Sequence, residues 1–191
     1  MLEAEKSLAM NRGVNRRSQR RSGFTLVELS LAMVIMVVAL VSISAATLQS
    51  HSLRRTNRER VLANNAVRSV AERIHSLSYR TIEDSPDDWV QEIINTYGPG
   101  GTIGNTFNVD ELNAPLGANT VGAITIITDE TTTDLDVNAN LGLPRDLNGD
   151  LDATDTDVTG DARLLPIVIT LNYRSGAGTA SITHAFFAVG F

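Results

Sequence analysis

The chain contains no cysteine and only one lysine among its 191 residues. Without cysteine, neither a disulfide framework nor a thiolate metal site can form. The single lysine is Lys6, so the rest of the chain has no lysine for a phosphate-binding loop, a Schiff base or general-base catalysis. Proline is also scarce, and because the first one is Pro86, the strongest helix breaker is missing from everything before it. A long helix without a proline kink is therefore expected in the N-terminal part.

Charge is distributed unevenly along the chain, so the formal net charge of −6 describes no single part of it. Residues 1–23 contain six basic and two acidic residues, and residues 24–80 contain seven arginines and three acidic residues, which gives each segment a net charge of +4. Residues 81–191 contain three arginines and 17 acidic residues, a net charge of −14. Two basic N-terminal segments thus precede an acidic C-terminal part.

Residues 29–50 form a run of 22 residues without a formal charge, directly after a basic stretch and Glu28. At ~1.5 Å per residue, a helix of this length spans about 33 Å, which is enough to cross the hydrocarbon core of a bilayer. The same pattern is typical of a secretory signal, and residues 44–46 offer small side chains for signal peptidase cleavage. The run is, however, longer than the ~7 to 15 apolar residues of such a signal. In addition, a carboxylate at the edge of a membrane span is costly unless it is paired, so Glu28 indicates a functional role.

The string from Gly23 to Glu28 (GFTLVE), between the arginines and the apolar run, carries a family resemblance. It resembles the class III signal of type IV pilins and type II secretion pseudopilins, over residues 16–45. The resemblance implies that prepilin peptidase cleaves after Gly23, that Phe24 becomes the N-methylated N-terminus, and that Glu28 is the carboxylate of the filament core. It also implies that the apolar helix is retained, first as membrane anchor and then as filament core.

The physical interpretation of Glu28 agrees with this resemblance. Glu28 lies one helical turn after Phe24, on the same face of the helix. The N-terminal ammonium of a neighbouring subunit would neutralise Glu28 in the apolar core of a fibre, and the alternative is a carboxylate that reaches the lipid headgroups. The leader is 23 residues long from Met1, and a start at Met10 would give 14 residues, closer to the short leaders of that family.

Residues 51–80 predict an amphipathic continuation of the same helix. Apolar residues recur there at steps of three and four, and Ala63 and Val67 broaden the stripe, so we expect one helix over residues 24–79. The apolar stripe is Leu62, Ala66, Val70, Ile74 and Leu77.

The same segment contains a basic run, Arg54, Arg55, Arg58 and Arg60. These arginines can face nucleic acid, anionic headgroups, the acidic heads of neighbouring subunits or solvent. Because no aromatic residues alternate with the arginines, a solvent-exposed helix face is favoured.

The C-terminal part predicts a small head. Ser85 as N-cap and Pro86 in the first turn indicate a short helix, ended by a glycine-rich loop whose spacing does not match a dinucleotide-binding fingerprint. A long helix first and an antiparallel sheet last give an α+β arrangement, in which a pilin-like sheet of three or four strands packs on the long helix. The expected ranges are 86–97 for the short helix, 104–109, 121–128, 165–173 and 179–189 for the strands, and 174–178 for the last hairpin.

An acidic segment, residues 131–161, separates the second and third expected strands and contains eight aspartates. From Asp146 to Asp157 its oxygen-bearing side chains alternate with other residues, as in the calcium loops of EF-hand and dockerin type, which the string resembles. It departs from them at Leu151, where those loops have a glycine, and in ending on aspartate in place of glutamate. The loop is a candidate Ca²⁺ site, and the alternative is a solvated acidic loop. The candidate ligands are Asp146, Asn148, Asp150, Asp152 and Asp157, with Asp134, Asp136 and Asn138 as a weaker second cluster.

No catalytic constellation is present in the sequence, because His51, His75 and His184 are scattered and no HExxH or GxSxG motif occurs. We therefore expect a non-enzymatic filament subunit of a type IV pilus or a type II secretion pseudopilus. A minor subunit is favoured, since the head is larger and more acidic than repetition in a fibre requires. The alternatives are a membrane-stalked module that binds a secreted substrate, DNA or a surface, and, less favoured, an enzyme.

The expected organisation has four parts with different locations. Residues 1–23 form a cleaved basic leader, 24–50 a transmembrane and filament-core helix, 51–80 its amphipathic continuation, and 81–191 a periplasmic head. A charge of +4 before the span against +3 in residues 54–60 agrees with a cytoplasmic N-terminus in the bacterial inner membrane. The expected partners are prepilin peptidase, other pilin or pseudopilin subunits, an inner-membrane assembly platform and membrane lipid, with nucleic acid a weaker expectation.

Overall fold

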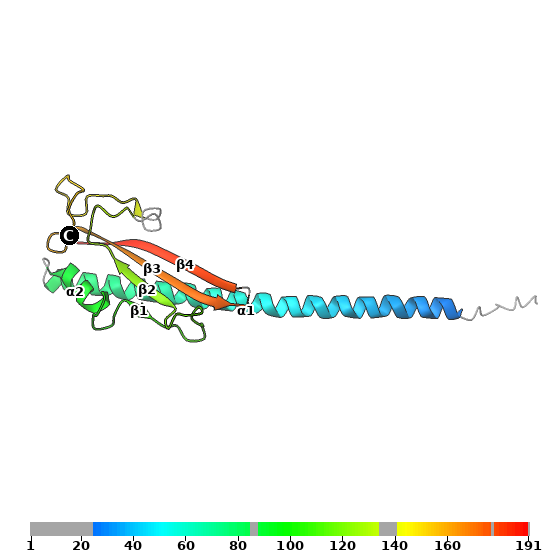
Figure 1. The fold of residues 1–191 in the computed structure, drawn as a ribbon. Coiled ribbons are helices and arrows are strands. Elements are labelled where there is room, and N and C mark those ends of the chain that lie inside the picture. The colour runs from blue at the N-terminus through cyan, green and yellow to red at the C-terminus, as the bar shows by residue number, and fades with distance from the viewer. Residues whose placement is uncertain (1–24, 85–87, 134–140, 177, 191) are drawn as a thin grey trace, which may run out of the picture. The chain divides into compact units, whose positions relative to one another are not determined.

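The computed structural model describes residues 25–84, 88–133, 141–176 and 178–190 (Figure 1). The chain divides into two compact units, Met1–Thr47 and Leu48–Phe191. One long helix comes first and four antiparallel strands follow, so the predicted α+β, pilin-like architecture is confirmed. The elements are α1 (Leu26–Asp84), α2 (Trp89–Tyr97), β1 (Thr106–Phe107), β2 (Gly122–Ile126), β3 (Leu164–Ser175) and β4 (Gly178–Val189).

The helix α1 begins at Leu26 and continues to Asp84, beyond the predicted end at residue 79. The extension has a simple cause, because nothing between residue 79 and Pro86 breaks a helix. In the first unit, the large apolar side chains from Leu26 to Ile43 are 55% to 84% exposed. A helix that is apolar on all sides needs lipid or partner chains to cover it, and α1 is long and apolar enough to cross a membrane.

Hydroxyl groups within the apolar part of α1 are satisfied by the helix itself. The hydroxyl of Ser42 donates to the carbonyl of Val38 at 2.8 Å, and Thr47 donates to Ile43 at 2.8 Å. Ser44 makes the same kind of bond at 2.9 Å. Because hydrocarbon offers no hydrogen-bond partner, this internal bonding lowers the cost of these polar residues in a membrane.

The sheet of the head has the strand order β1-β2-β3-β4, and each neighbouring pair is antiparallel. All four predicted strands are present, although β1 is only two residues long, and the predicted hairpin is confirmed by the pairing of Ser175 with Gly178. In the β1–β2 pair, Phe107 lies opposite Gly122. A Cβ atom at Gly122 would overlap the Phe107 ring, so a larger residue at this position would force the ring to move.

The short helix α2 begins at Trp89, later than the predicted start at residue 86. Asp88 occupies the N-cap position, while Ser85 and Pro86 lie outside the described residues. The helix buries Trp89, Val90, Ile93 and Tyr97 on one face. It ends at Gly98, whose N–H donates to the carbonyl of Ile94 at 2.7 Å, so the predicted loop at residues 98–101 is confirmed.

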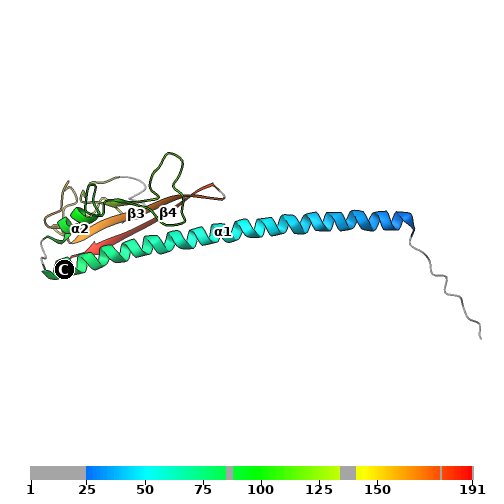
Figure 2. The ribbon, with the colours of Figure 1, turned by 90° about the horizontal axis from the view of Figure 1, so that it is seen from below.

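The core of the head lies between the second half of α1 and the sheet, where β3 and β4 run along the helix (Figure 2). The buried apolar residues of α1 are Ala63, Val67, Ala71 and Ile74. The predicted apolar face is confirmed, since it includes Ile74, Ala63 and Val67, although Leu62, Ala66 and Val70 on its flank are only half-buried. These three line a cavity of about 460 Å³ beside residues 103–110, so a loop and the sheet share the wide apolar face of α1.

Glu59 joins α1 to the β3–β4 hairpin. Only 7% of Glu59 is exposed. One of its carboxylate oxygens accepts a hydrogen bond from the Ser175 hydroxyl at 2.6 Å, and the other accepts one from Arg55 Nε at 2.8 Å. The Ser175 bond is the main cause that lowers the pKa of Glu59, with a smaller contribution from Arg55. The carboxylate therefore stays ionised at a nearly buried position.

Candidate functional site

The N-terminal end of α1 is held by a capping box formed by Thr25 and Glu28. The backbone N–H and the hydroxyl of Thr25 donate to Glu28 Oε2 at 3.0 and 3.1 Å. In return, the N–H of Glu28 donates to the Thr25 hydroxyl oxygen at 3.2 Å. This reciprocal pattern satisfies N–H groups that the first helical turn leaves free. The predicted cleavage residues Gly23 and Phe24 lie outside the described residues, and Glu28 lies just inside them.

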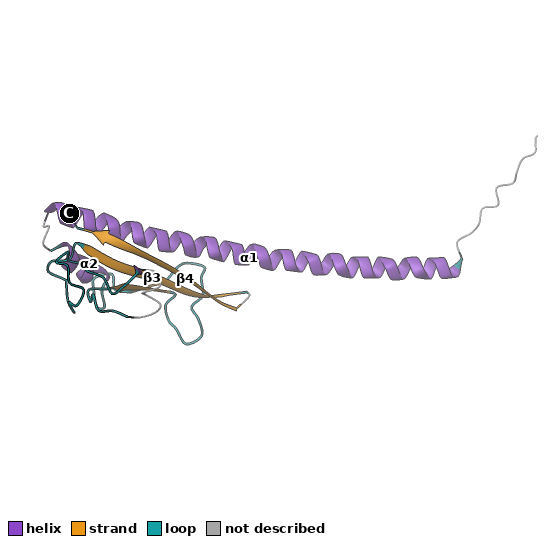
Figure 3. Ribbon diagram, turned by 90° about the horizontal axis from the view of Figure 1, so that it is seen from above, coloured by secondary structure: helices purple, strands orange, loops and turns teal. Residues whose placement is uncertain are grey.

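The second candidate site is the acidic loop, whose described residues 142–163 contain no helix or strand (Figure 3). Three of the predicted ligands lie in one tight turn. Asp146 accepts the N–H groups of Gly149 and Leu151, the latter at 2.9 Å, and this donation lowers the pKa of Asp146, mainly through Gly149. The Asn148 amide oxygen accepts the N–H of Asp150 at 3.1 Å. These oxygens therefore stabilise the turn itself.

The other two predicted ligands make local hydrogen bonds with their own chain neighbours. Asp152 accepts the N–H of its neighbour Ala153 at 2.8 Å. Asp157 accepts the hydroxyl and the N–H of Thr159, and these bonds lower its pKa. Among the described residues, no group of three or more acidic or histidine side chains is placed to hold a metal ion. Calcium binding by the five predicted ligands stays a prediction, and the weaker cluster at residues 134–138 lies outside the described residues.

Leu151 takes the backbone conformation that the sixth residue of such a loop needs, although it is not glycine. Its φ angle is +75°, and its side chain is 95% exposed. A side chain with a Cβ atom pays a free-energy cost of about 1–2 kcal/mol in this left-handed region. The turn is thus formed in spite of the sequence departure at this position.

One residue that sequence reasoning missed is Glu130, which is completely buried. Its Oε1 accepts the N–H groups of Leu147 and Asn148, the latter at 3.4 Å. Its Oε2 is buried and has no hydrogen-bond partner among the described residues. The surrounding string TDETTT contains no apolar periodicity, so nothing in the sequence distinguishes this carboxylate from a surface acid.

The basic run of α1 is partly neutralised within the chain. Arg55 pairs with Glu59, and Arg58 Nη2 lies 2.7 Å from the Glu111 carboxylate in the loop after β1. Two of the four arginines that the sequence marked as a possible nucleic-acid or lipid surface thus bind acids of the same chain. The Arg55 pair lies within α1, and the largely exposed Arg58 pair links α1 to the loop after β1.

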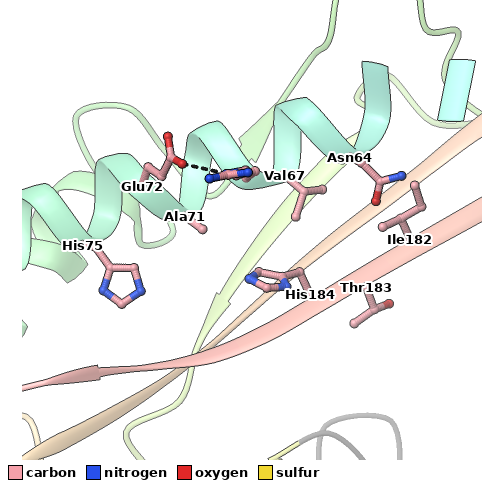
Figure 4. A pocket seen from close by; sticks show the side chains of 9 residues that line it. Asn64, Val67, Ala71, Glu72, His75, Ile182, Thr183 and His184 are labelled. Carbon is pink, nitrogen blue, oxygen red and sulfur yellow. Dashed lines mark hydrogen bonds and ion pairs between the residues drawn. The ribbon is translucent and has the colours of Figure 1, made fainter. Parts of the chain in front are cut away.

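Two of the histidines line a cavity of about 510 Å³ between α1 and β4 (Figure 4). His75 packs against the ring of Phe186, with a centroid distance of 4.7 Å, and His184 lies 5.6 Å from the same ring. At the rim, Arg68 pairs with Glu72 at 2.8 Å. The two imidazoles therefore serve as packing groups around Phe186.

Comparison with known families gives one match, at the N-terminal end. Residues 18–44 match the family model described as the prokaryotic N-terminal methylation motif, which is the class III prepilin signal. The match covers Gly23, Phe24, Glu28 and most of the apolar run. No curated protein and no solved structure matches the chain.

The matched motif agrees with the resemblance noted from the sequence and is consistent with a type IV pilin or pseudopilin. It points to a pilin-like structural subunit rather than an enzyme. The motif implies processing by prepilin peptidase and assembly with other pilin subunits. Together with the exposed apolar part of α1, it fits a membrane-anchored precursor.

Proposed function

We infer that the chain is the precursor of a minor pilin-like subunit of a type IV pilus or a type II secretion pseudopilus. Prepilin peptidase removes residues 1–23, and the new N-terminal Phe24 is methylated. The observation that carries this proposal is the methylation motif at residues 18–44, which overlaps the start of a helix long enough to span a membrane. The mature subunit keeps this helix as its anchor.

The charge distribution supports a defined orientation in the inner membrane. The leader has a net charge of +4 and stays in the cytoplasm, in keeping with the preference of basic segments for that side. The head, with its net charge of −14 over residues 81–191, enters the periplasm. A strongly acidic head repels other acidic heads, which suits a subunit present in few copies better than one repeated along a fibre. The assembly platform and lipid are its further partners.

Assembly transfers the apolar helix from lipid to a bundle of like helices. The Glu28 carboxylate is costly in an apolar bundle unless it is paired with a cation. The ammonium created at Phe24 of an adjacent subunit supplies that cation. The capping box holds Glu28 in the first turn of α1. In the fibre, the N-terminus of the adjacent subunit would lie beside this turn and pair with Glu28.

Substitution of Glu28 by alanine tests this role. In cells that contain the assembly machinery, E28A should be cleaved but should enter filaments at least tenfold less efficiently than the wild type. Thr47→Ala is the matched control, because it removes a polar group from the same helix without removing charge. Sheared filaments and membranes are compared by quantitative immunoblotting. Equal incorporation of E28A and wild type would refute the role.

A further inference from the structure

The strand β4 forms one edge of the sheet, and this edge is open. Among the described strands, β4 pairs only with β3. Sheets commonly shield such an edge with charged residues, proline, a bulge or a short strand, because its free N–H and C=O groups can pair with another chain. The 12 residues of β4 contain no proline, lysine, arginine or acid, and the pairing with β3 runs without a bulge from Gly178 to Val189. The edge therefore lacks the usual protection.

Alternate residues of β4 direct their backbone polar groups to this edge. The Gly190 N–H donates to the Arg163 carbonyl at 2.8 Å, which fixes the alternation of the antiparallel ladder. Even-numbered residues of β4 bond to β3, and odd-numbered residues point away from it. Within the described part of the chain, the odd-numbered residues make no other backbone hydrogen bond. The outward-pointing residues are Thr179, Ser181, Thr183, Ala185, Phe187 and Val189.

A cavity of about 510 Å³ lies along the same edge, between β4 and α1 (Figure 4). Its apolar lining includes Val67 and Ala71 of α1 and Ile182 of β4. The even-numbered side chains of β4 face α1, since Phe186 packs against His75 with a centroid distance of 4.7 Å. A strand added to β4 would also place every second side chain on the α1 side. The cavity there suits an aliphatic side chain.

The opposite face of the sheet is basic beside β4. The odd-numbered side chains of β4 point to this face, as do those of their partners on β3. Arg174 lies opposite Thr179 at one end of β4, and Arg145 lies over the Phe187 ring at 5.3 Å near the other end. All 17 acidic residues of the segment 81–191 precede residue 162, so the β3–β4 hairpin contains no acid. Side chains of an added strand that point to this face would therefore meet positive charge.

We propose that β4 binds an extended segment of a partner protein as a fifth strand, and that this segment alternates aliphatic with acidic residues. The aliphatic side chains enter the cavity beside α1, and the acidic side chains meet Arg145 and Arg174 on the other face. Addition of a strand to a sheet edge takes its affinity from main-chain hydrogen bonds and its specificity from alternate side chains. A second copy of this chain fits less well, because pairing of β4 with β4 brings two basic hairpins together.

Peptide binding to the purified full chain in detergent tests the proposal. The probe is a short capped peptide that alternates valine and aspartate, and its binding is followed by fluorescence anisotropy. A valine–lysine peptide should bind about tenfold more weakly, because its charge is reversed. A valine–aspartate peptide with methyl groups on alternate backbone nitrogens should also bind about tenfold more weakly, since it cannot form the ladder. Equal binding of the methylated and unmethylated peptides would overturn the proposal.

Thr183→Pro tests the edge itself. The Thr183 N–H points away from β3, so proline removes a donor of the free edge and leaves the bonds to β3 in place. T183P should lose about tenfold in affinity for the valine–aspartate peptide, whereas the matched control T183A should bind it as the wild type does. Equal affinities of T183P and T183A would contradict binding at this edge.

Arg174→Glu keeps the proposal open to refutation if T183P does not fold. The Arg174 side chain is exposed, and its reversal should weaken binding of the aspartate peptide and strengthen binding of the lysine peptide. An unchanged preference would overturn the proposal, and so would a dimer of the chain that T183A retains and R174E disrupts, because it would assign the edge to a second copy. The assay needs no cleavage, methylation or filament, so its failure leaves the assembly role of Glu28 intact.

Discussion

The hydroxyl of Ser175 should contribute measurably to the stability of the head, because it donates to a carboxylate that is almost completely buried. Ser175 lies at the end of β3, next to the hairpin, and its partner Glu59 lies on α1. Replacement of Ser175 by alanine removes one oxygen and leaves the backbone pairing with Gly178 unchanged. The variant therefore isolates a single link between the hairpin and the helix.

The expected cost follows from the burial of the partners. A hydrogen bond to a charged group contributes about 1.5–3 kcal/mol when it is protected from water. Arg55, the other partner of Glu59, has a side chain that is 66% exposed, so its ion pair adds only about 0–1 kcal/mol and cannot replace the lost bond. We expect S175A to lose about 1.5 kcal/mol, which lowers the melting temperature by about 3–6 °C in a chain of this size.

The penalty of this variant should depend on pH. The Ser175 bond lowers the pKa of Glu59 below its value of 4.5 in the unfolded chain. Stabilisation from an acid with a lowered pKa is fully present above the unfolded value and is lost as the pH falls through the folded value. The difference in melting temperature between wild type and S175A should therefore be full at pH 7 and should shrink below pH 4.5.

Thermal unfolding of the full chain in detergent, followed by circular dichroism, measures the effect. Ser181→Ala is the matched control, because Ser181 lies on the same hairpin but is exposed. A penalty for S175A that equals that of S181A, or that is the same at pH 3 and pH 7, would refute the reasoning.

Three further predictions concern backbone and processing. Gly122→Ala should destabilise the head by about 1–3 kcal/mol in urea unfolding, and Phe107→Ala should relieve part of that cost, so additive penalties would contradict the close contact. Leu151→Gly should raise stability by about 1 kcal/mol, since a glycine takes the positive φ without strain, and unchanged stability would contradict the loop geometry. Gly23→Ala should block cleavage by prepilin peptidase on immunoblots, whereas Gly13→Ala in the same leader should not, and equal cleavage of both would contradict the assigned junction.

Local sequence patterns were enough to predict the elements of this fold. The uncharged run and the absence of proline before Pro86 predict α1, and the glycines around residue 176 predict the last hairpin. The register of the buried face was harder, because the loop at residues 103–110 covers the flank of α1 that carries Ala66. Which flank a loop covers depends on contacts between distant residues, and no periodicity within the helix encodes them.

The candidate sites also differ in how far the sequence alone could predict them. The motif around Glu28 is contiguous, so the sequence alone was sufficient to find it. The buried carboxylate of Glu130 is bonded to the backbone of Leu147 and Asn148, which follow it by 17 and 18 residues, so no local sequence pattern identifies it. Alternating aspartates identified the loop as a candidate cation site but did not indicate which oxygens face its interior.

The N-terminus of the mature protein decides between a retained anchor and a removed signal peptide. The chain should be purified from membranes of cells that contain prepilin peptidase, and its intact mass and N-terminal sequence should be determined. We predict a chain that starts at Phe24, with one additional methyl group on its N-terminal nitrogen. A mature chain that starts near residue 47, or one that keeps the basic leader, would contradict the assignment as a pilin-like subunit.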